Sequence, residues 1–110
     1  PYVDPVMHLL GGAAAAFFFI RMPRVAPKLF CERTRTTLYL LGFGLTNGVG
    51  VIWEFGEFLS DFYVGTRIQR SLGNTMTDLS NAMAGAMILI FCELTLHRST
   101  TKLRSPSASN

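Results

Sequence analysis

The positions of the charged residues constrain this chain more than any other feature of its sequence. Asp, Glu, Lys and Arg make up 15% of its 110 residues, and they fall between or at the ends of three apolar stretches whose centres are almost uncharged. An apolar stretch of about 20 residues is long enough for a helix that crosses a bilayer. The sequence therefore predicts an all-α fold, a small bundle of three transmembrane helices at about residues 5–21, 37–62 and 75–97.

The ends of the chain differ in character from these stretches. Residues 1–98 are expected to form one transmembrane domain, and residues 99–110, which are rich in Ser and Thr, a flexible polar tail. In the first helix, Asp4 precedes the apolar run and Arg21 follows it, which is the reverse of the charge order in a signal peptide. We expect a retained helix that Pro23 and Pro27 bring to an end, because proline has no N–H to donate.

Lys and Arg are unevenly distributed among the segments that flank the predicted helices. Five lie between the first and second helices, three follow the third, and two lie between the second and third. Because basic residues favour the cytoplasmic side, the N-terminus is predicted outside and the C-terminus in the cytoplasm. The protein is then a multi-pass protein of the bacterial inner membrane. Thiols stay reduced on the cytoplasmic side, so Cys31 and Cys92 are expected to be free.

Glycines recur at helical spacing in the apolar stretches. Gly44 and Gly48 form a small-xxx-small pair in the second helix, and Gly12 and Gly85 lie in the first and third. In lipid such residues let neighbouring helices approach closely. We expect these faces to pack against protein rather than lipid.

Ionisable side chains of all three predicted helices share one level near the outer membrane boundary. Carboxylates that face lipid are costly, so the side chains are expected to face inward. They can form a hydrogen-bonded clamp, hold a divalent metal, or relay protons. The last acidic residues of the second helix can instead be solvated beyond the hydrocarbon. The predicted polar set is His8, Glu54, Glu57, Asp61, Asp78 and Asn81.

Three motifs carry a resemblance to a known family. They are Asp4-xxx-His8-xx-Gly11-Gly12, Glu54-xx-Glu57-xxx-Asp61-xxx-Gly65 and Thr75-xx-Asp78-xx-Asn81-xxx-Gly85-Ala86. The chain resembles the YjdF family of uncharacterised bacterial membrane proteins and, more remotely, VanZ-type membrane proteins. Members of that family usually have additional helices, and they have an acid where Asn74 stands, a departure that counts against a metal site. The resemblance implies a compact helical membrane domain and carries no settled activity.

Two function classes follow from these features. The first is an accessory or structural subunit of a larger membrane complex, for which a photosynthetic or respiratory assembly is a natural host. It is favoured by the glycine-rich faces and by the lack of a complete catalytic set, so an enzyme is the less favoured reading. The second is a membrane-embedded metal-dependent enzyme or ion-handling protein that uses the predicted polar set.

A third possible class is pigment binding, whereas nucleic-acid binding is excluded. His8, with the small residues Gly12 and Ala16 below it, leaves room for a flat macrocycle whose metal the imidazole can ligate. Nucleic-acid binding is excluded, because the basic residues are split between a loop and a tail and have no interleaved aromatic residues for base stacking. The expected partners are the lipid bilayer and other membrane subunits.

Overall fold

The described part of the chain folds into three helices. The computed structural model describes residues 3–27 and 34–103, with residues 98–103 as backbone only. The helices are α1 (Val3–Val25), α2 (Arg35–Val64) and α3 (Leu72–Leu103). Each is long and apolar enough to cross a membrane, which confirms the predicted fold class. Cys92 is an exposed free thiol, whereas the prediction for Cys31 concerns a residue outside the described ranges.

The prediction that Pro23 ends the first helix is wrong. α1 continues through Pro23 to Val25, and the N–H of Ala26 still donates to the carbonyl oxygen of Met22 at 3.0 Å. A proline removes its own hydrogen bond and crowds the carbonyl group one turn earlier, but Pro23 lies two residues before the end of α1, so little of the helix follows this disruption. The helix ends where the next proline follows, because a residue that precedes proline is disfavoured in the helical conformation.

The ends of α2 have local causes in the sequence. Thr34 caps the N-terminus, with its hydroxyl oxygen accepting from the N–H of Thr37 at 3.3 Å. Gly65 ends the helix in the left-handed region at φ 75°, and its N–H donates to the carbonyl oxygen of Asp61. α3 extends to Leu103, so its backbone stays helical into the segment expected to be a polar tail.

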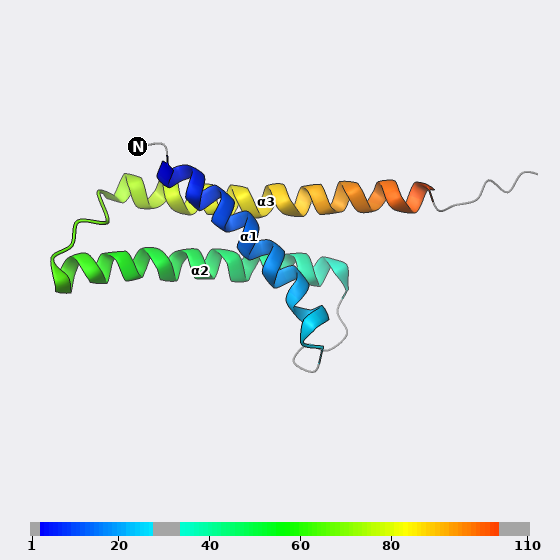
Figure 1. Cartoon of the computed structure of the whole chain (residues 1–110), viewed down its shortest axis with the longest axis horizontal. Helices are drawn as coiled ribbons and strands as arrows, with labels where there is room; N and C mark the ends of the chain where they lie inside the picture. The colour runs from blue at the N-terminus through cyan, green and yellow to red at the C-terminus, as the bar shows by residue number, and fades with distance from the viewer. Residues whose placement is uncertain (1–2, 28–33, 104–110) are drawn as a thin grey trace, which may run out of the picture.

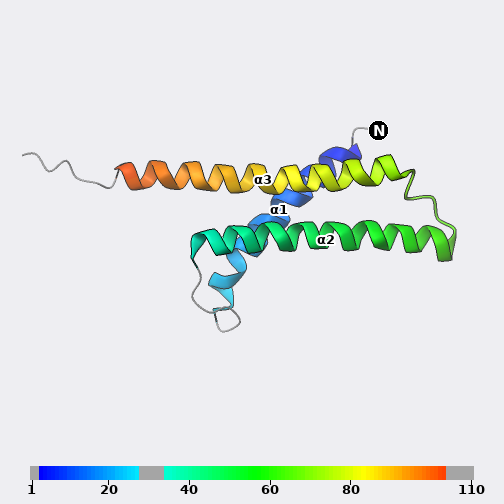
Figure 2. The ribbon, with the colours of Figure 1, turned by 180° about the vertical axis from the view of Figure 1, so that it is seen from behind.

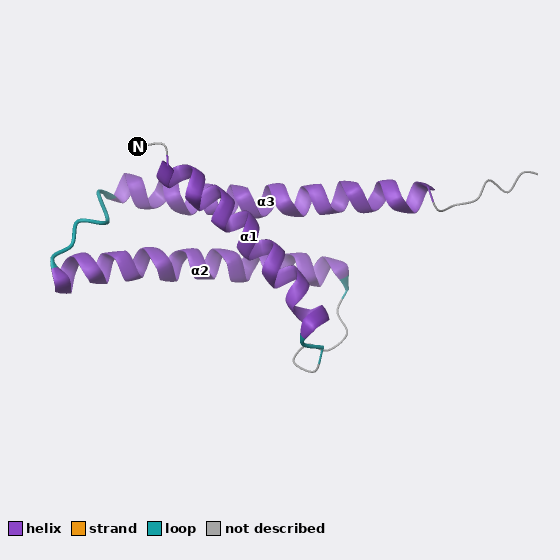
Figure 3. Ribbon diagram, in the orientation of Figure 1, coloured by secondary structure: helices purple, strands orange, loops and turns teal. Residues whose placement is uncertain are grey.

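The helices form two layers (Figures 1 and 3). α2 and α3 lie side by side and antiparallel, and α1 crosses both obliquely over one face, as the view from behind also shows (Figure 2). The N-terminal part of α1 lies along the start of α3, and its C-terminal part passes over the start of α2. Most of the packing of α1 is against α3.

Glycine allows the closest approach in the fold, between α1 and α3. A Cβ added to Gly12 would lie 2.0 Å from the carbonyl oxygen of Ala82, and one added to Gly85 would lie 1.9 Å from that of Leu9. No side chain fits at either position, so the two backbones touch directly. This glycine crossing fixes how α1 and α3 lie against each other.

The interior is small and follows α1. The buried apolar side chains in the described residues are Ala16, Ile20, Ala82 and Ala86. Ile20 packs against α2 at Gly42, where an added Cβ would lie 2.6 Å from the Ile20 Cγ1 atom. Many large apolar side chains lie uncovered by the chain itself, as in helices that meet lipid or further helices.

Gly44 and Gly48 differ from the glycines of the crossing. Both are exposed, and none of the described residues places a heavy atom within 4 Å of a Cβ added to either one. The expected close packing at this face therefore does not occur between helices of this chain, and it stays a prediction for a partner.

Candidate functional site

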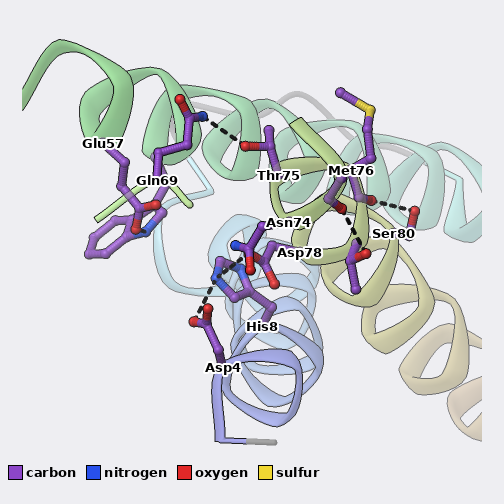
Figure 4. Close-up of polar contacts among 12 residues, drawn as sticks. Asp4, His8, Glu57, Gln69, Asn74, Thr75, Met76, Asp78 and Ser80 are labelled. Carbon is purple, nitrogen blue, oxygen red and sulfur yellow. Dashed lines mark hydrogen bonds and ion pairs between the residues drawn. The ribbon is translucent and has the colours of Figure 1, made fainter. Parts of the chain in front are cut away.

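The glycine crossing brings polar side chains of α1 and α3 together. His8 lies one turn before Gly12 on α1, and Asp78 lies two turns before Gly85 on α3. The His8 Nε2 atom is 4.0 Å from the Asp78 Oδ2 atom and 3.7 Å from the Asp4 Oδ1 atom, which comes from the preceding turn of α1. Figure 4 shows the imidazole between the two carboxyl groups. We call Asp4, His8 and Asp78 the polar cluster.

Asp78 is the most enclosed member of the polar cluster, with 1% of its surface exposed. Its Oδ2 accepts a hydrogen bond from the side-chain amide of Asn74, one helical turn earlier (Figure 4). Its Oδ1 is buried and has no hydrogen-bond partner among the described residues. A buried carboxylate oxygen without a donor is costly, so this atom is the part of the cluster that most requires a further ligand.

The spacing of the cluster suits a cation after a small adjustment. One oxygen or nitrogen from each of Asp4, His8 and Asp78 lies within 4.8 Å of the others. Two ligands about 2.1 Å from a tetrahedral zinc ion lie about 3.4 Å apart. Rotamer changes of the three side chains would bring their ligand atoms close enough together for metal–ligand bonds. One nitrogen and two carboxylate groups form a donor set used by several divalent metals.

α2 contributes a second enclosed carboxyl group at the same end of the bundle. Glu54 is 5% exposed, and the Thr75 hydroxyl lies near its carboxyl group, although neither carboxyl oxygen has a hydrogen bond of normal geometry among the described residues. It interacts electrostatically with His8 and Asp78 across the bundle and with Glu57 on its own helix. Three helices thus supply ionisable groups here, with Glu54 outside the bonding distances of the polar cluster.

The remaining members of the predicted polar set have other surroundings. Glu57 accepts a hydrogen bond from the Trp53 indole N–H at 2.8 Å. Asp61 accepts from the backbone N–H groups of Ile68 and Gln69, each at 2.9 Å, and so closes the turn after α2. Asn81 is half-buried on α3 and lies outside the polar cluster.

A groove of about 440 Å³ between α1 and α2 opens beside the polar cluster. Asp4, His8 and Glu57 line its polar end, and Met7, Ala15 and Val49 are among the residues of its apolar part. The groove gives the polar cluster access from the side of the bundle. A ligand that enters there meets the imidazole before it meets the enclosed Asp78.

The space for a flat macrocycle is not where the sequence suggested. Gly12 touches the Ala82 backbone of α3, and Ala16 is fully buried, with Gly42 of α2 close to its backbone. That argument for a pigment is therefore wrong. The groove beside His8 is lined on α1 by Gly11, Gly12 and Ala15, and it does not include Ala16.

Two residues of the site were missing from the predicted polar set. Asp4 was treated only as a flanking charge and a family motif residue, although its spacing of four from His8 puts both on one helix face. Asn74 was noted only as a departure from the family pattern, whereas it is the donor to Asp78. Its spacing of four from Asp78 was the available signal.

A family model described as Predicted membrane protein (DUF2238) matches residues 1–99. The match includes all of the polar cluster, the glycine crossing and the groove. The chain belongs to the DUF2238 family. No curated protein and no solved structure matches it. Membership in DUF2238 agrees with a membrane protein of three apolar helices and leaves the narrower likeness to YjdF and VanZ proteins as a prediction.

Proposed function

We propose that this DUF2238 protein is an accessory or structural subunit of a larger membrane complex in the cell inner membrane. The observation that carries the proposal is the open glycine face of α2. Gly44 and Gly48 lie one turn apart, both exposed, with no heavy atom of the described chain within 4 Å of an added Cβ. By contrast, Gly12, Gly42 and Gly85 are in close contact with a neighbouring helix of the chain, whereas Gly11 and Gly56 are uncovered and lack the paired spacing.

The open face is suited to a helix of another subunit. Small-xxx-small pairs let two helices in lipid approach until their backbones touch. Glycine also costs helix stability relative to alanine, so a pair on a helix face without a neighbour brings no benefit within this chain. A partner helix would supply the benefit. A photosynthetic or respiratory assembly remains our proposed host.

Size analysis of the protein purified in mild detergent from its native membrane tests this role. Gly48→Leu should shift the protein from a large complex to a smaller species, and mass spectrometry should identify the chains that are lost. Gly56→Leu is the matched control, because Gly56 is also uncovered and lies about 80° around the helix from Gly48. An unchanged complex in Gly48→Leu would contradict the proposal.

The orientation of the subunit follows from the basic residues and is part of the proposal. The segment between α1 and α2 is expected in the cytoplasm. In a Cys92→Ser variant the remaining thiol is that of Cys31 in this segment. An impermeant maleimide should label it only after the cells are opened. Labelling in intact cells would show that the orientation is the opposite of the one proposed.

A second candidate function rests on the polar cluster, which we propose as a divalent-cation site of an ion-handling or metal-dependent membrane protein. Three ligand atoms within 4.8 Å and the unpartnered Asp78 Oδ1 support it. The residues present fit such an ion, with one imidazole nitrogen and carboxylate oxygens from two helices. A bound cation would also offset the charge of Glu54.

Metal analysis after purification and dialysis distinguishes this candidate from a purely structural cluster. We expect about one zinc or manganese ion per chain, retained through dialysis, and a loss in His8→Ala. Glu57→Gln should keep the metal, because Glu57 is bonded to Trp53 and lies outside the polar cluster. Equal metal content in wild type and His8→Ala would contradict the proposed cation site at the polar cluster.

A further inference from the structure

A cleft lined by arginines lies at the end of the bundle opposite the polar cluster. Its volume is about 360 Å³, and all three helices contribute to it. Three arginines line it, Arg21 and Arg24 near the end of α1 and Arg35 at the start of α2. We call this the arginine cleft. Its other lining residues are Ile20, Leu38, Tyr39, Glu93, Leu96 and His97.

The arginine cleft carries an excess of positive charge. Among the described residues, Glu93 is the acidic residue that lines it, and it accepts a hydrogen bond from the Arg21 guanidinium. Within residues 3–27 and 34–97, neither Arg24 nor Arg35 forms a salt bridge, and both are exposed. Two guanidinium charges are therefore uncompensated by described residues at the mouth of the cleft.

Arg21 is held in place and still has a donor to offer. Its guanidinium lies over the Phe17 ring at 5.0 Å and is bonded to Glu93. Its Nε atom is buried and has no hydrogen-bond acceptor among the described residues. The Arg21 side chain is 35% exposed as a whole, so an oxyanion in the cleft would meet the accessible part of the guanidinium rather than the enclosed Nε.

The start of α2 adds to the attraction for an anion. Its first turn contains no acidic residue, so the positive end of the helix dipole is not offset within the helix. Arg35 is the first residue of that turn. Backbone N–H groups, the helix dipole and Arg35 then favour negative charge at the same place.

The cleft also has the depth and the apolar lining that suit a lipid. The first candidate membrane span ends at Val25 and the second begins at Arg35, so the cleft lies where α1 and α2 reach one membrane boundary. Phospholipid phosphates lie at that level. Leu38 and Leu96 continue the cleft with accessible apolar surface, which an acyl chain would cover and inorganic phosphate would not.

We propose that the arginine cleft binds the phosphate of an anionic phospholipid, with an acyl chain along Leu38 and Leu96. The guanidinium groups of Arg21, Arg24 and Arg35 contact the phosphate oxygens. This site is independent of the polar cluster and of the open glycine face. It assigns a ligand to the end of the bundle that the proposed functions leave unused.

Native mass spectrometry of the detergent-purified full chain tests this site. Phosphatidylglycerol should bind at about one molecule per chain at low concentration, whereas phosphatidylcholine with the same acyl chains should bind on the order of tenfold more weakly. Millimolar inorganic phosphate should leave phosphatidylglycerol bound. Equal binding of the two lipids, or displacement by inorganic phosphate, would overturn the proposal.

Paired charge-removing variants localise the binding. Arg24→Gln/Arg35→Gln should weaken phosphatidylglycerol binding on the order of tenfold, and it should stay folded because both side chains are exposed. Arg67→Gln/Arg70→Gln removes the same charge at the other end of the bundle, where both residues are also exposed. It should bind like wild type. Equal loss in the two double variants would mean nonspecific attraction and would overturn the assignment.

Discussion

The two ends of the bundle hold charge in different ways, although α1 contributes to both. At the polar cluster, α1 touches the backbone of α3 through Gly12 and Gly85, and Asp78 is enclosed at 1% exposure. At the arginine cleft, α1 has passed over α2, and Arg24 and Arg35 remain exposed around an open volume. Where the helices approach closely, a charged side chain is enclosed and needs a partner within the chain. Where they diverge, it stays exposed and does not.

The largest expected effect comes from filling the glycine crossing. Gly85→Ala places a Cβ 1.9 Å from the Leu9 carbonyl oxygen, so the helices must separate and the free energy of unfolding should fall by about 3 kcal/mol. Gly44→Ala adds the same methyl group in open space and should leave stability unchanged or raise it by up to about 1 kcal/mol, because alanine favours the helix. Reversible unfolding by sodium dodecyl sulfate from mixed micelles measures both. Equal effects would mean that α1 and α3 do not meet at glycine.

A smaller effect is expected from the donor to the enclosed carboxyl group. Asn74→Ala removes the hydrogen bond to Asp78 Oδ2 and leaves both oxygens of Asp78 without that support. The unfolding free energy should fall by about 1 to 2 kcal/mol. Thr77→Ala serves as the control, because Thr77 is exposed and bonds only to the Gly73 carbonyl oxygen of its own helix. A control as damaging as Asn74→Ala would show that the Asp78 interaction contributes little.

The smallest effect is expected at the open end. Glu93→Gln removes the charge that pairs with Arg21, and their side chains are 20% and 35% exposed. Because solvent and headgroups can replace the lost interaction, the unfolding free energy should fall by only about 0.5 kcal/mol. The same unfolding experiment measures it. A loss larger than that of Asn74→Ala would reverse the contrast between the two ends.

The sequence predicted the helices well because the bilayer pattern of charges is local and strong. It also predicted that His8 and Asp78 occupy one level, since helical rise and topology suffice for that inference. The identity of the donor to Asp78 was missed. Asn74 lies four residues before Asp78, but this spacing alone does not distinguish a solvated amide from a donor. The enclosure of the Asp78 carboxyl group makes the hydrogen bond from Asn74 important.

Glycine patterns were less decisive, because spacing does not reveal which helix lies opposite. Gly12 and Gly85 meet across α1 and α3, whereas Gly44 and Gly48, which have the clearer motif, meet no described residue. The oblique path of α1 determines this difference. The arginine cleft was missed for the same reason, since its lining comes from the ends of three helices that are distant in sequence.

Cross-linking between α1 and α3 tests the central claim most directly, which is that the glycine crossing brings His8 to Asp78. In a background without Cys31 and Cys92, His8→Cys/Asp78→Cys should be joined rapidly by a short bifunctional thiol reagent in native membranes. Met7→Cys/Asp78→Cys is the matched pair, because Met7 is the neighbouring residue and is 62% exposed. We predict efficient linkage for the His8 pair and little for the Met7 pair. Equal linkage, or preferential linkage of the Met7 pair, would contradict the account.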